Sequence, residues 1–315
     1  MVDKMMKEGM KLTIVVVVAV ASVIASFAGG YVLGSANTQD NTKMFTLVDD
    51  LGRVVSLNGF PQRIISVAPT PTEVVFAIGA EDLLVGIDTY SDYPNSTANI
   101  TKIGDSSNLN VEKIISLEPD VIISSDLIPQ AQLDFLATHG IPYLILTAKN
   151  ISGVYKDIRL IGQITNHSSD ANALVSSLQI RVKAITDKTL ASNVTHPKTL
   201  LEYYPIWTYG QGSFGDDLIR LAGGTNIAGN MSGEYVSVDP SFVISKNPDV
   251  IIYTVGSMTI TTKSDITGRP GWQTISAVVN DKIFEVNDDL ITLYGPRIVD
   301  GLEDLAALLH PELFP

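Results

Sequence analysis

Aromatic and polar residues accumulate at the ends of the predicted β-strands. Open α/β sheets bind ligands outside the carboxyl ends of their strands. An aromatic lining there suits a large, flat or ring-bearing ligand. A single aromatic residue is more often core or surface than ligand contact, and Trp207 stands out because its segment is polar and flanked by glycine. The predicted ligand-binding residues are Pro69, Thr70, Tyr90, Tyr93, Ser125, Tyr204, Trp207, Tyr209, Tyr235, Met258 and Tyr294.

The sequence offers little for covalent or metal chemistry. It has no cysteine, which excludes thiolate nucleophiles, Cys-bound metal sites and an anchor on an N-terminal cysteine. Its four histidines form no i,i+4 pair. No nucleophile-elbow, P-loop, zinc-protease or dinucleotide-binding motif occurs, and the Gly-rich run 210–215 is interpreted as a strand-to-helix turn. We therefore predict no catalytic residue, no bound metal, no cofactor and no enzymatic activity.

One stretch occurs twice and organises the chain. Residues 114–124 read IISLEPDVIIS, and residues 243–253 read VISKNPDVIIY. Each copy is the end of a helix, a Pro-Asp corner and a short β-branched run that is typical of a buried parallel strand. Two copies about 130 residues apart predict two similar α/β lobes.

The expected fold class is α/β, with two Rossmann-like lobes joined by a single long α-helix. A hairpin over 45–57, a strand over 63–67 and a helix over 73–78, preceded by a proline break at 69–72, begin the N-terminal lobe, 44–151. Connecting helices occupy 152–197, where apolar residues three or four apart over 170–190 form one helical stripe. The C-terminal lobe, 198–315, is expected to contain a helix over 272–278 and a closing helix over 298–309.

The N-terminal segment, 1–36, has the pattern of a membrane anchor. Lys4, Lys7 and Lys11 precede the uncharged run Leu12–Leu33, which is long enough as a helix, about 33 Å, to cross a bilayer. The lysines place this end in the cytoplasm and the folded part outside. A secretory signal cleaved near Gly34-Ser35-Ala36 is the alternative. Residues 37–43 are expected to be a polar tether.

Six N-x-S/T sequons agree with an extracellular location, and chance would give about two or three. The candidate glycosylation sites are Asn95, Asn99, Asn150, Asn166, Asn193 and Asn230. The chain has a net charge of −13 and no basic block beyond the N-terminus, so it lacks the positively charged surface that nucleic-acid binding requires.

An ordered set of motifs resembles the substrate-binding proteins of ABC importers for vitamin B12 and ferric siderophores. The set spans roughly 44–315 and comprises DDLGR (49–53) with PQRIIS (61–66), TEVVFAIGA (72–80), LEPDVI (117–122), AGGTN (222–226) and PDVI (248–251). The ending, GPRI (295–298) with His310-Pro311, resembles archaeal members.

The resemblance implies two lobes bridged by one long helix, a transported metal chelate between them, and an ABC permease with its ATPase subunits as partner. It also implies that an acidic residue on the first helix of each lobe docks onto permease arginines. Glu73 matches the first, and its place at the start of a helix after a proline break predicts a carboxylate that faces outward and is stabilised by the helix N-terminus. Arg220 stands where the second acid is expected, so Asp216 and Asp217, one turn earlier, are the candidates in the C-terminal lobe.

Three functions compete at this stage. The first is an anchored extracellular receptor that delivers a corrinoid or ferric siderophore to a permease, and a lining poor in Arg and Lys favours a neutral corrinoid. The second is a two-lobed enzyme acting on a metallocofactor, which the missing catalytic motifs disfavour. The third is a receptor for free zinc or manganese, which the scattered histidines disfavour.

Overall fold

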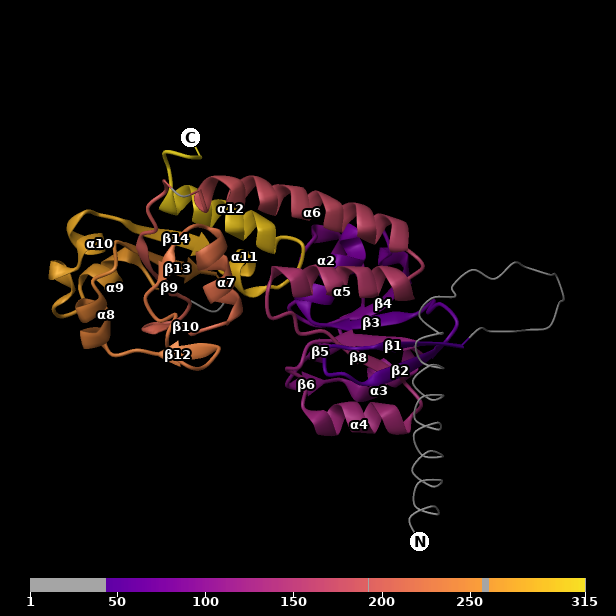
Figure 1. The fold of residues 1–315 in the computed structure, drawn as a ribbon. Helices are drawn as coiled ribbons and strands as arrows, with labels where there is room; N and C mark the ends of the chain where they lie inside the picture. The colour runs from indigo at the N-terminus through magenta and orange to yellow at the C-terminus, as the bar shows by residue number, and fades with distance from the viewer. Residues whose placement is uncertain (1–43, 192, 257–260, 315) are drawn as a thin grey trace, which may run out of the picture. The chain divides into compact units, whose positions relative to one another are not determined.

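Two parallel sheets with the same strand order form the scaffold of the protein. The computed structural model describes residues 44–191, 193–256 and 261–314. One four-stranded sheet has the order β4-β3-β7-β8 and the other the order β11-β9-β13-β14, with every pairing in both parallel (Figure 1). In both sheets the first strand in sequence order, β3 or β9, has the second strand on one side and the third strand on the other. The predicted duplication of α/β architecture is therefore confirmed.

The N-terminal lobe contains the first of these sheets. Its buried strands need helices on both faces, because parallel strands are apolar on both sides. Its elements are β1 (Met44–Val48), β2 (Val54–Asn58), β3 (Ile64–Val67), α2 (Pro69–Ala77), η1 (Glu81–Leu83), β4 (Leu84–Ile87), η2 (Asn95–Asn99), β5 (Gly104–Asp105), β6 (Asn108–Leu109), α3 (Val111–Ser116), β7 (Val121–Ser124), α4 (Gln130–Thr138) and β8 (Tyr143–Ile145).

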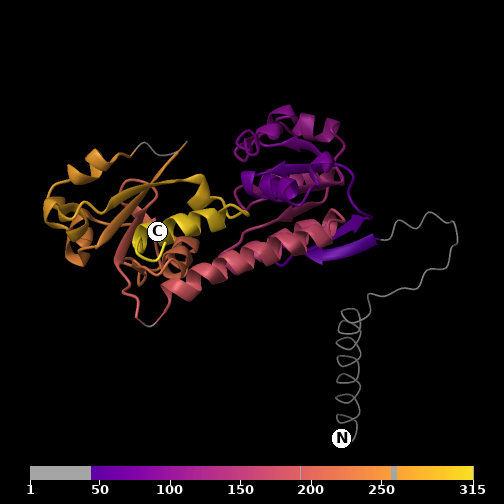
Figure 2. The ribbon, with the colours of Figure 1, turned by 90° about the horizontal axis from the view of Figure 1, so that it is seen from above.

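Two helices follow this sheet, α5 (Ile151–Ile164) and α6 (Ser168–Thr189). The side chain of Asn150 starts α5 by accepting a hydrogen bond from the Gly153 amide at 2.9 Å. The long helix α6 packs against α5 on one side and against helices of the C-terminal lobe on the other (Figure 2). Arg181 of α6 binds Glu303 and Asp300 at 2.6 Å, which ties this helix to the end of the chain.

The C-terminal lobe repeats the arrangement around its own sheet. Its elements are β9 (Lys198–Glu202), β10 (Trp207–Tyr209), α7 (Phe214–Leu221), β11 (Thr225–Asn226), β12 (Tyr235–Ser237), α8 (Pro240–Lys246), β13 (Val250–Val255), α9 (Lys263–Thr267), η3 (Trp272–Thr274), α10 (Ser276–Val279), β14 (Ile283–Asn287), α11 (Asp289–Thr292) and α12 (Ile298–Leu309). The single helix expected over 272–278 is wrong: extended backbone at Ile275 divides it into η3 and α10.

The duplicated stretch forms the same corner in both lobes. The residue before each proline has a left-handed backbone, with φ of 44° at Glu118 and 47° at Asn247. Such a conformation ends the helix and turns the chain into the strand. The aspartate that follows binds backbone amides at the start of the neighbouring strand: Asp120 accepts from Arg63 at 2.9 Å, and Asp249 from Lys198 at 2.9 Å. The corner thus sets the register of the third strand beside the first.

Helix α2 begins earlier than the sequence predicts. Pro69 and Pro71 were expected to break the chain before a helix at Glu73, but both lie in the first turn of α2. Proline is tolerated there because the first amides of a helix have no partner within the helix. Glu73 consequently lies beyond the first turn, so the expectation of a favourable helix N-terminus around its carboxylate is wrong.

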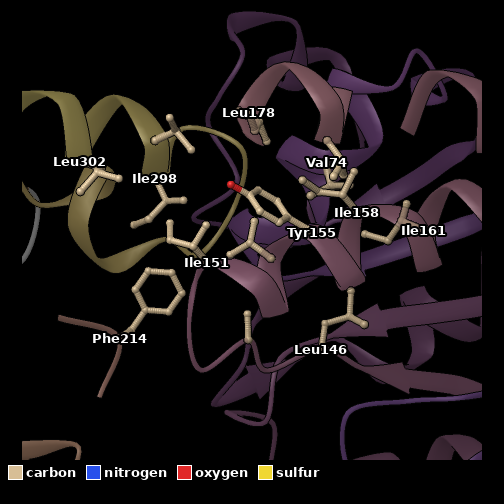
Figure 3. Close-up of a cluster of buried hydrophobic side chains, with 14 of the residues drawn as sticks. Val74, Leu146, Ile151, Tyr155, Ile158, Ile161, Leu178, Phe214, Ile298 and Leu302 are labelled. Carbon is tan, nitrogen blue, oxygen red and sulfur yellow. The ribbon is translucent and has the colours of Figure 1, made fainter. Parts of the chain in front are cut away.

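One apolar cluster passes from the sheet of the N-terminal lobe through the connecting helices into the C-terminal lobe. Ile151 and Tyr155 of α5 and Leu178 of α6 pack in the same cluster as Phe214 of α7 and Ile298 of α12 (Figure 3). All five side chains are buried. Because interiors are packed as densely as organic crystals, a shared core resists relative motion of the parts that contribute to it.

No helix among the described residues combines the length and apolar character that a membrane span requires. The anchor predicted for Leu12–Leu33 and the tether predicted for 37–43 lie outside the described residues.

The shared core predicts that ligand binding moves the two lobes little. Closure would require buried side chains of α5, α6 and α12 to slide past one another, so only a small rotation is expected. Small-angle scattering with and without saturating ligand should give nearly identical radii of gyration. A marked compaction on ligand addition would contradict this prediction.

Asp157 of α5 is a buried acid without a cationic contact strong enough to keep it ionised. It is 3% exposed, and burial, reinforced by the negative charge of Asp50, raises its pKa to about 8 from 3.8. The folded chain therefore holds this proton between about pH 4 and pH 8, whereas the unfolded chain has released it. Stability must fall as the pH rises through that window, by about 1.4 kcal/mol per pH unit from this group.

Asp157→Asn should remove that slope and leave the variant more stable than the native chain at pH 7.5. The difference in free energy of unfolding between the variant and the native chain should narrow towards pH 5. Near that pH, release of the Asp157 proton stabilises the unfolded native chain less. Thermal melts at pH 5, 6.5 and 8 measure the effect, with Glu81→Gln, an exposed change, as control. Parallel melting curves for native and variant chains across the range would refute the assignment.

Candidate ligand-binding site

Both sheets present a switch point where strand order reverses. In the N-terminal lobe this lies between β3 and β7, and in the C-terminal lobe between β9 and β13. The connections leave such a point towards opposite sides, and open sheets bind ligands in the crevice outside the carboxyl ends of the two strands. Pro69 and Thr70 follow β3, and Ser125 follows β7, so all three lie at the first switch point and are half-buried.

A network of buried hydroxyl groups holds the loop that follows β4. Asp88 is 3% exposed, accepts from the Tyr90 amide at 3.1 Å and binds the Ser91 hydroxyl. Ser91 in turn contacts the Thr72 hydroxyl of α2 at 2.8 Å. Burial raises the pKa of Asp88. The base of the loop is thus fixed to α2, while Tyr90 at its tip is 64% exposed.

Tyr93, in the same loop, packs against an arginine of the other lobe. The Arg297 guanidinium carbon lies 4.0 Å from the centre of the Tyr93 ring. The same guanidinium binds both carboxylate oxygens of Glu73, Nε to Oε2 at 3.0 Å and an Nη to Oε1 at 2.5 Å. Tyr93 remains 47% exposed, so part of its ring is open to solvent.

The expectation that Glu73 faces outward is wrong. Its residue exposure is 4%, and burial raises the pKa of its carboxyl even though Arg297 acts in the opposite direction. The sequence reasoning placed Glu73 in an exposed first turn. In the structure α2 starts at Pro69, so Glu73 lies in its second turn, where its carboxylate binds Arg297. Docking of Glu73 onto a permease stays a prediction, and it would require release of this ion pair.

The C-terminal lobe contributes a cluster of tyrosines, Tyr203, Tyr209 and Tyr235. Their ring centres lie 4.8–5.5 Å apart in tilted pairs, a favourable arrangement for aromatic rings. Tyr235 is 40% exposed, whereas Tyr209 is completely buried. Tyr209 was expected to face a ligand, and its burial corrects this: the residue supports Tyr203 and Tyr235 from behind.

Tyr294 completes this cluster from the segment before α12. Its ring stacks on Phe214 with centres 4.0 Å apart and planes 4° from parallel, and its hydroxyl lies 3.0 Å from that of Tyr235. Burial raises the pKa values of both Tyr235 and Tyr294, and the nearby Glu234 raises them further. Both phenols therefore remain neutral at physiological pH and are available as hydrogen-bond donors.

Trp207 lies in a two-stranded sheet that the sequence did not predict, and Tyr204 lies in the turn before it. β10 pairs with β12 in antiparallel fashion, which places Trp207 opposite Ser237 and Tyr209 opposite Tyr235. The Trp207 amide donates to the Tyr204 carbonyl at 2.7 Å in the tight turn before β10. Trp207 is 38% and Tyr204 54% exposed, so both present aromatic surface to solvent. Met258, the remaining candidate, lies outside the described residues.

Two cations beside these aromatic residues are already paired with carboxylates. Arg297 is engaged by Glu73, and Lys149 lies 3.2 Å from Glu234, the residue before Tyr235. Asp126 adds negative charge near Tyr235 and raises the pKa of its hydroxyl.

Sequence reasoning missed Arg297 and Tyr203. Arg297 was visible within the Gly295-Pro296-Arg297 motif, but no local signal linked it to Tyr93 or Glu73.

The acids proposed for docking in the C-terminal lobe also have partners within the chain. Asp216 accepts hydrogen bonds from the Asn226 amide at 2.9 Å and from the Gly212 backbone at 3.0 Å. Asp217 pairs with Arg220 at 2.5 Å and accepts from the backbone of Ile151 at 3.3 Å. Their docking role stays a prediction.

All six sequon asparagines are exposed in the structure: Asn95, Asn99, Asn150, Asn166, Asn193 and Asn230. Exposure permits glycosylation without requiring it, so these sites stay predictions.

Among the described residues, no group of three or more histidine or acidic side chains is arranged to hold a metal ion.

Comparison with known proteins agrees with this architecture. A model of the periplasmic binding protein family matches residues 64–290. An uncharacterised ABC transporter substrate-binding lipoprotein of Bacillus subtilis is 31% identical over 89% of this chain and 90% of its own.

Two solved structures are similar over most of the chain. The periplasmic vitamin B12 binding protein of Vibrio cholerae has 25% identity and a TM-score of 0.68, over 80% of this chain and 97% of its own. A periplasmic heme-binding protein of Roseiflexus, in apo form, has 25% identity and a TM-score of 0.71, over 79% of this chain and 98% of its own. With a family match over most of its length and this relative in Bacillus subtilis, the chain belongs to the periplasmic binding protein family.

Proposed function

We propose that this protein is the substrate-binding component of an ABC importer and that it captures a corrinoid. The observation that carries the proposal is the exposed aromatic surface at the strand ends of both lobes. Tyr90 and Tyr93 supply it from the N-terminal lobe, and Tyr204, Trp207 and Tyr235 from the C-terminal lobe. Such surfaces recognise a large ring system by contact area and single hydrogen bonds, and capture requires no bond-breaking step.

The charges near these residues favour a neutral or cationic ligand over an anionic ferric siderophore. Arginine and lysine recognise anionic chelates through charge-assisted hydrogen bonds. Here Arg297 and Lys149 are already held by carboxylates, and Glu234 and Asp126 add negative charge. An incoming anion would have to compete with Glu73 and Glu234 for these cations, which costs binding energy.

The proposed partner is an ABC permease dimer with its ATPase subunits, as the description of the Bacillus subtilis relative suggests. We further propose that Leu12–Leu33 anchors the chain in the membrane, with the folded part outside. The lysines before this run and the six exposed sequons support that orientation. An anchor of this kind would take the place of the lipid of a lipoprotein, since the chain has no cysteine.

A ligand screen tests the proposed function. Cyanocobalamin, cobinamide, hemin and ferric siderophores are added to the protein, and thermal shift and titration calorimetry measure binding. We expect the corrinoids to stabilise the fold by about 2.7 kcal/mol at a hundredfold excess over Kd.

Trp207→Ala should weaken corrinoid binding by roughly 1–3 kcal/mol, because it removes ring contact at an exposed position. Phe135→Ala, which removes an aromatic ring that is 48% exposed on α4, should not weaken it. Binding of a ferric siderophore or of hemin without corrinoid binding would overturn the ligand assignment.

A chain comprising residues 37–315 should be soluble and monomeric without detergent, since the run long enough to cross a bilayer lies before it. Size-exclusion chromatography with light scattering measures this directly. A requirement for detergent would show that membrane association does not depend on Leu12–Leu33.

A further inference from the structure

Arg297 joins parts of the chain that are 224 residues apart. It directly precedes α12 of the C-terminal lobe and forms a bidentate ion pair with Glu73 on α2 of the N-terminal lobe. The side chain of Glu73 is 3% and that of Arg297 17% exposed. Breaking such a pair leaves a buried charge without a partner, so the contact is costly to open.

The same guanidinium sets the position of Tyr93. Its central carbon lies over the ring, 4.0 Å from the ring centre, so one face of Tyr93 is covered. The loop that carries Tyr93 is fixed at its base through Asp88 and Ser91. With the base fixed and one face covered, the exposed part of the ring is presented in one orientation.

Arginine is specifically suited to this position. Its planar fork binds both oxygens of Glu73 while its face lies on the tyrosine ring, which the compact ammonium of lysine cannot do. Asp289 Oδ2 lies 3.6 Å from the Arg297 Nη that also binds Glu73, and its negative charge adds to the field that holds the guanidinium in place.

We propose that Arg297 is a positioning residue for ligand capture: it holds Tyr93 ready for the ligand and, through Glu73, makes that geometry depend on contact between the lobes. The proposal rests on the proposed function, because it takes Tyr93 as a ligand contact. Arg297 itself acts through Tyr93 and does not bind the ligand.

A double-mutant cycle tests the coupling between the two residues. Arg297→Lys and Tyr93→Ala are made singly and together in the full chain, and cyanocobalamin affinity is measured by calorimetry. We expect Arg297→Lys to weaken binding about tenfold in the native background, the scale of a partly desolvated cation–ring contact. In the Tyr93→Ala background the same change should have less than about a twofold effect, because the ring through which it acts is gone.

The chain offers a matched control within one lobe. Arg269 binds Glu202 in a bidentate pair at 2.6 Å, covers the ring of Trp272 at 4.5 Å and has a side-chain exposure of 15%. Arg269→Lys breaks the same kind of contact inside the C-terminal lobe. It should lower the melting temperature as Arg297→Lys does, yet leave cyanocobalamin affinity unchanged.

If the Arg297→Lys variant does not fold, a variant with both Arg297→Gln and Glu73→Gln takes its place in the cycle. That variant removes both charges of the ion pair together. Equal loss of affinity with and without Tyr93, or equal loss in Arg269→Lys, would mean that Arg297 only stabilises the fold and would overturn the proposal. Absence of cyanocobalamin binding by the native chain would instead overturn the proposed function, and this inference with it.

Discussion

The apolar core shared by the two lobes is the constraint on which the rest of the structure depends. Each parallel sheet must be covered on both faces. In this chain α5 and α6 cover the N-terminal lobe while the same cluster continues to Phe214 and Ile298 of the C-terminal lobe. Burial of such side chains contributes about 25 cal/mol per Å² of apolar surface. The connection between lobes is thus part of the core and not a separate linker.

A rigid core allows the polar contacts between lobes to be specific. The Arg297–Glu73 pair, the Asp217 contact to the start of α5, and the Lys149–Glu234 pair all join the two lobes. They differ in burial: Lys149 is largely exposed, and exposed pairs contribute about 0–1 kcal/mol. The buried Arg297–Glu73 pair depends on close packing around it, because only a fixed geometry compensates for removing both charges from water.

The tyrosine cluster of the C-terminal lobe shows how a rigid binding surface is made on a short two-stranded sheet. Tyr209 is buried in the interior, where it contacts Tyr203 and Tyr235 and keeps Tyr235 at the surface. Aromatic side chains have only two rotatable bonds, so fixing them costs little entropy and gives a large contact area. The phenols of Tyr235 and Tyr294 stay neutral because they are buried and lie near carboxylate side chains. Neutral phenols suit recognition by stacking and single hydrogen bonds.

The sequence by itself determined the features that depend on neighbours along the chain. The β-branched runs, the helical stripe of α6 and the Pro-Asp corners are local patterns, and they predicted the two parallel sheets and the duplicated architecture. The family resemblance followed from the same motifs in order. Of the candidate ligand residues, Tyr90, Tyr93 and Ser125 lie on the loops after β4 and β7 with exposed or half-buried side chains, and their contact with a ligand stays a prediction.

Only the tertiary structure decided what depends on residues far apart. Glu73 has the sequence of an exposed helical acid, and its burial follows from Arg297, which approaches from the other end of the chain. Tyr209 and Tyr235 lie on paired strands that α7 and β11 separate along the chain, and packing alone determined which one is buried. Periodicity reports which face of an element is apolar, but it does not identify the partner that covers that face. The long-range contacts that settle this form only when the whole chain is folded.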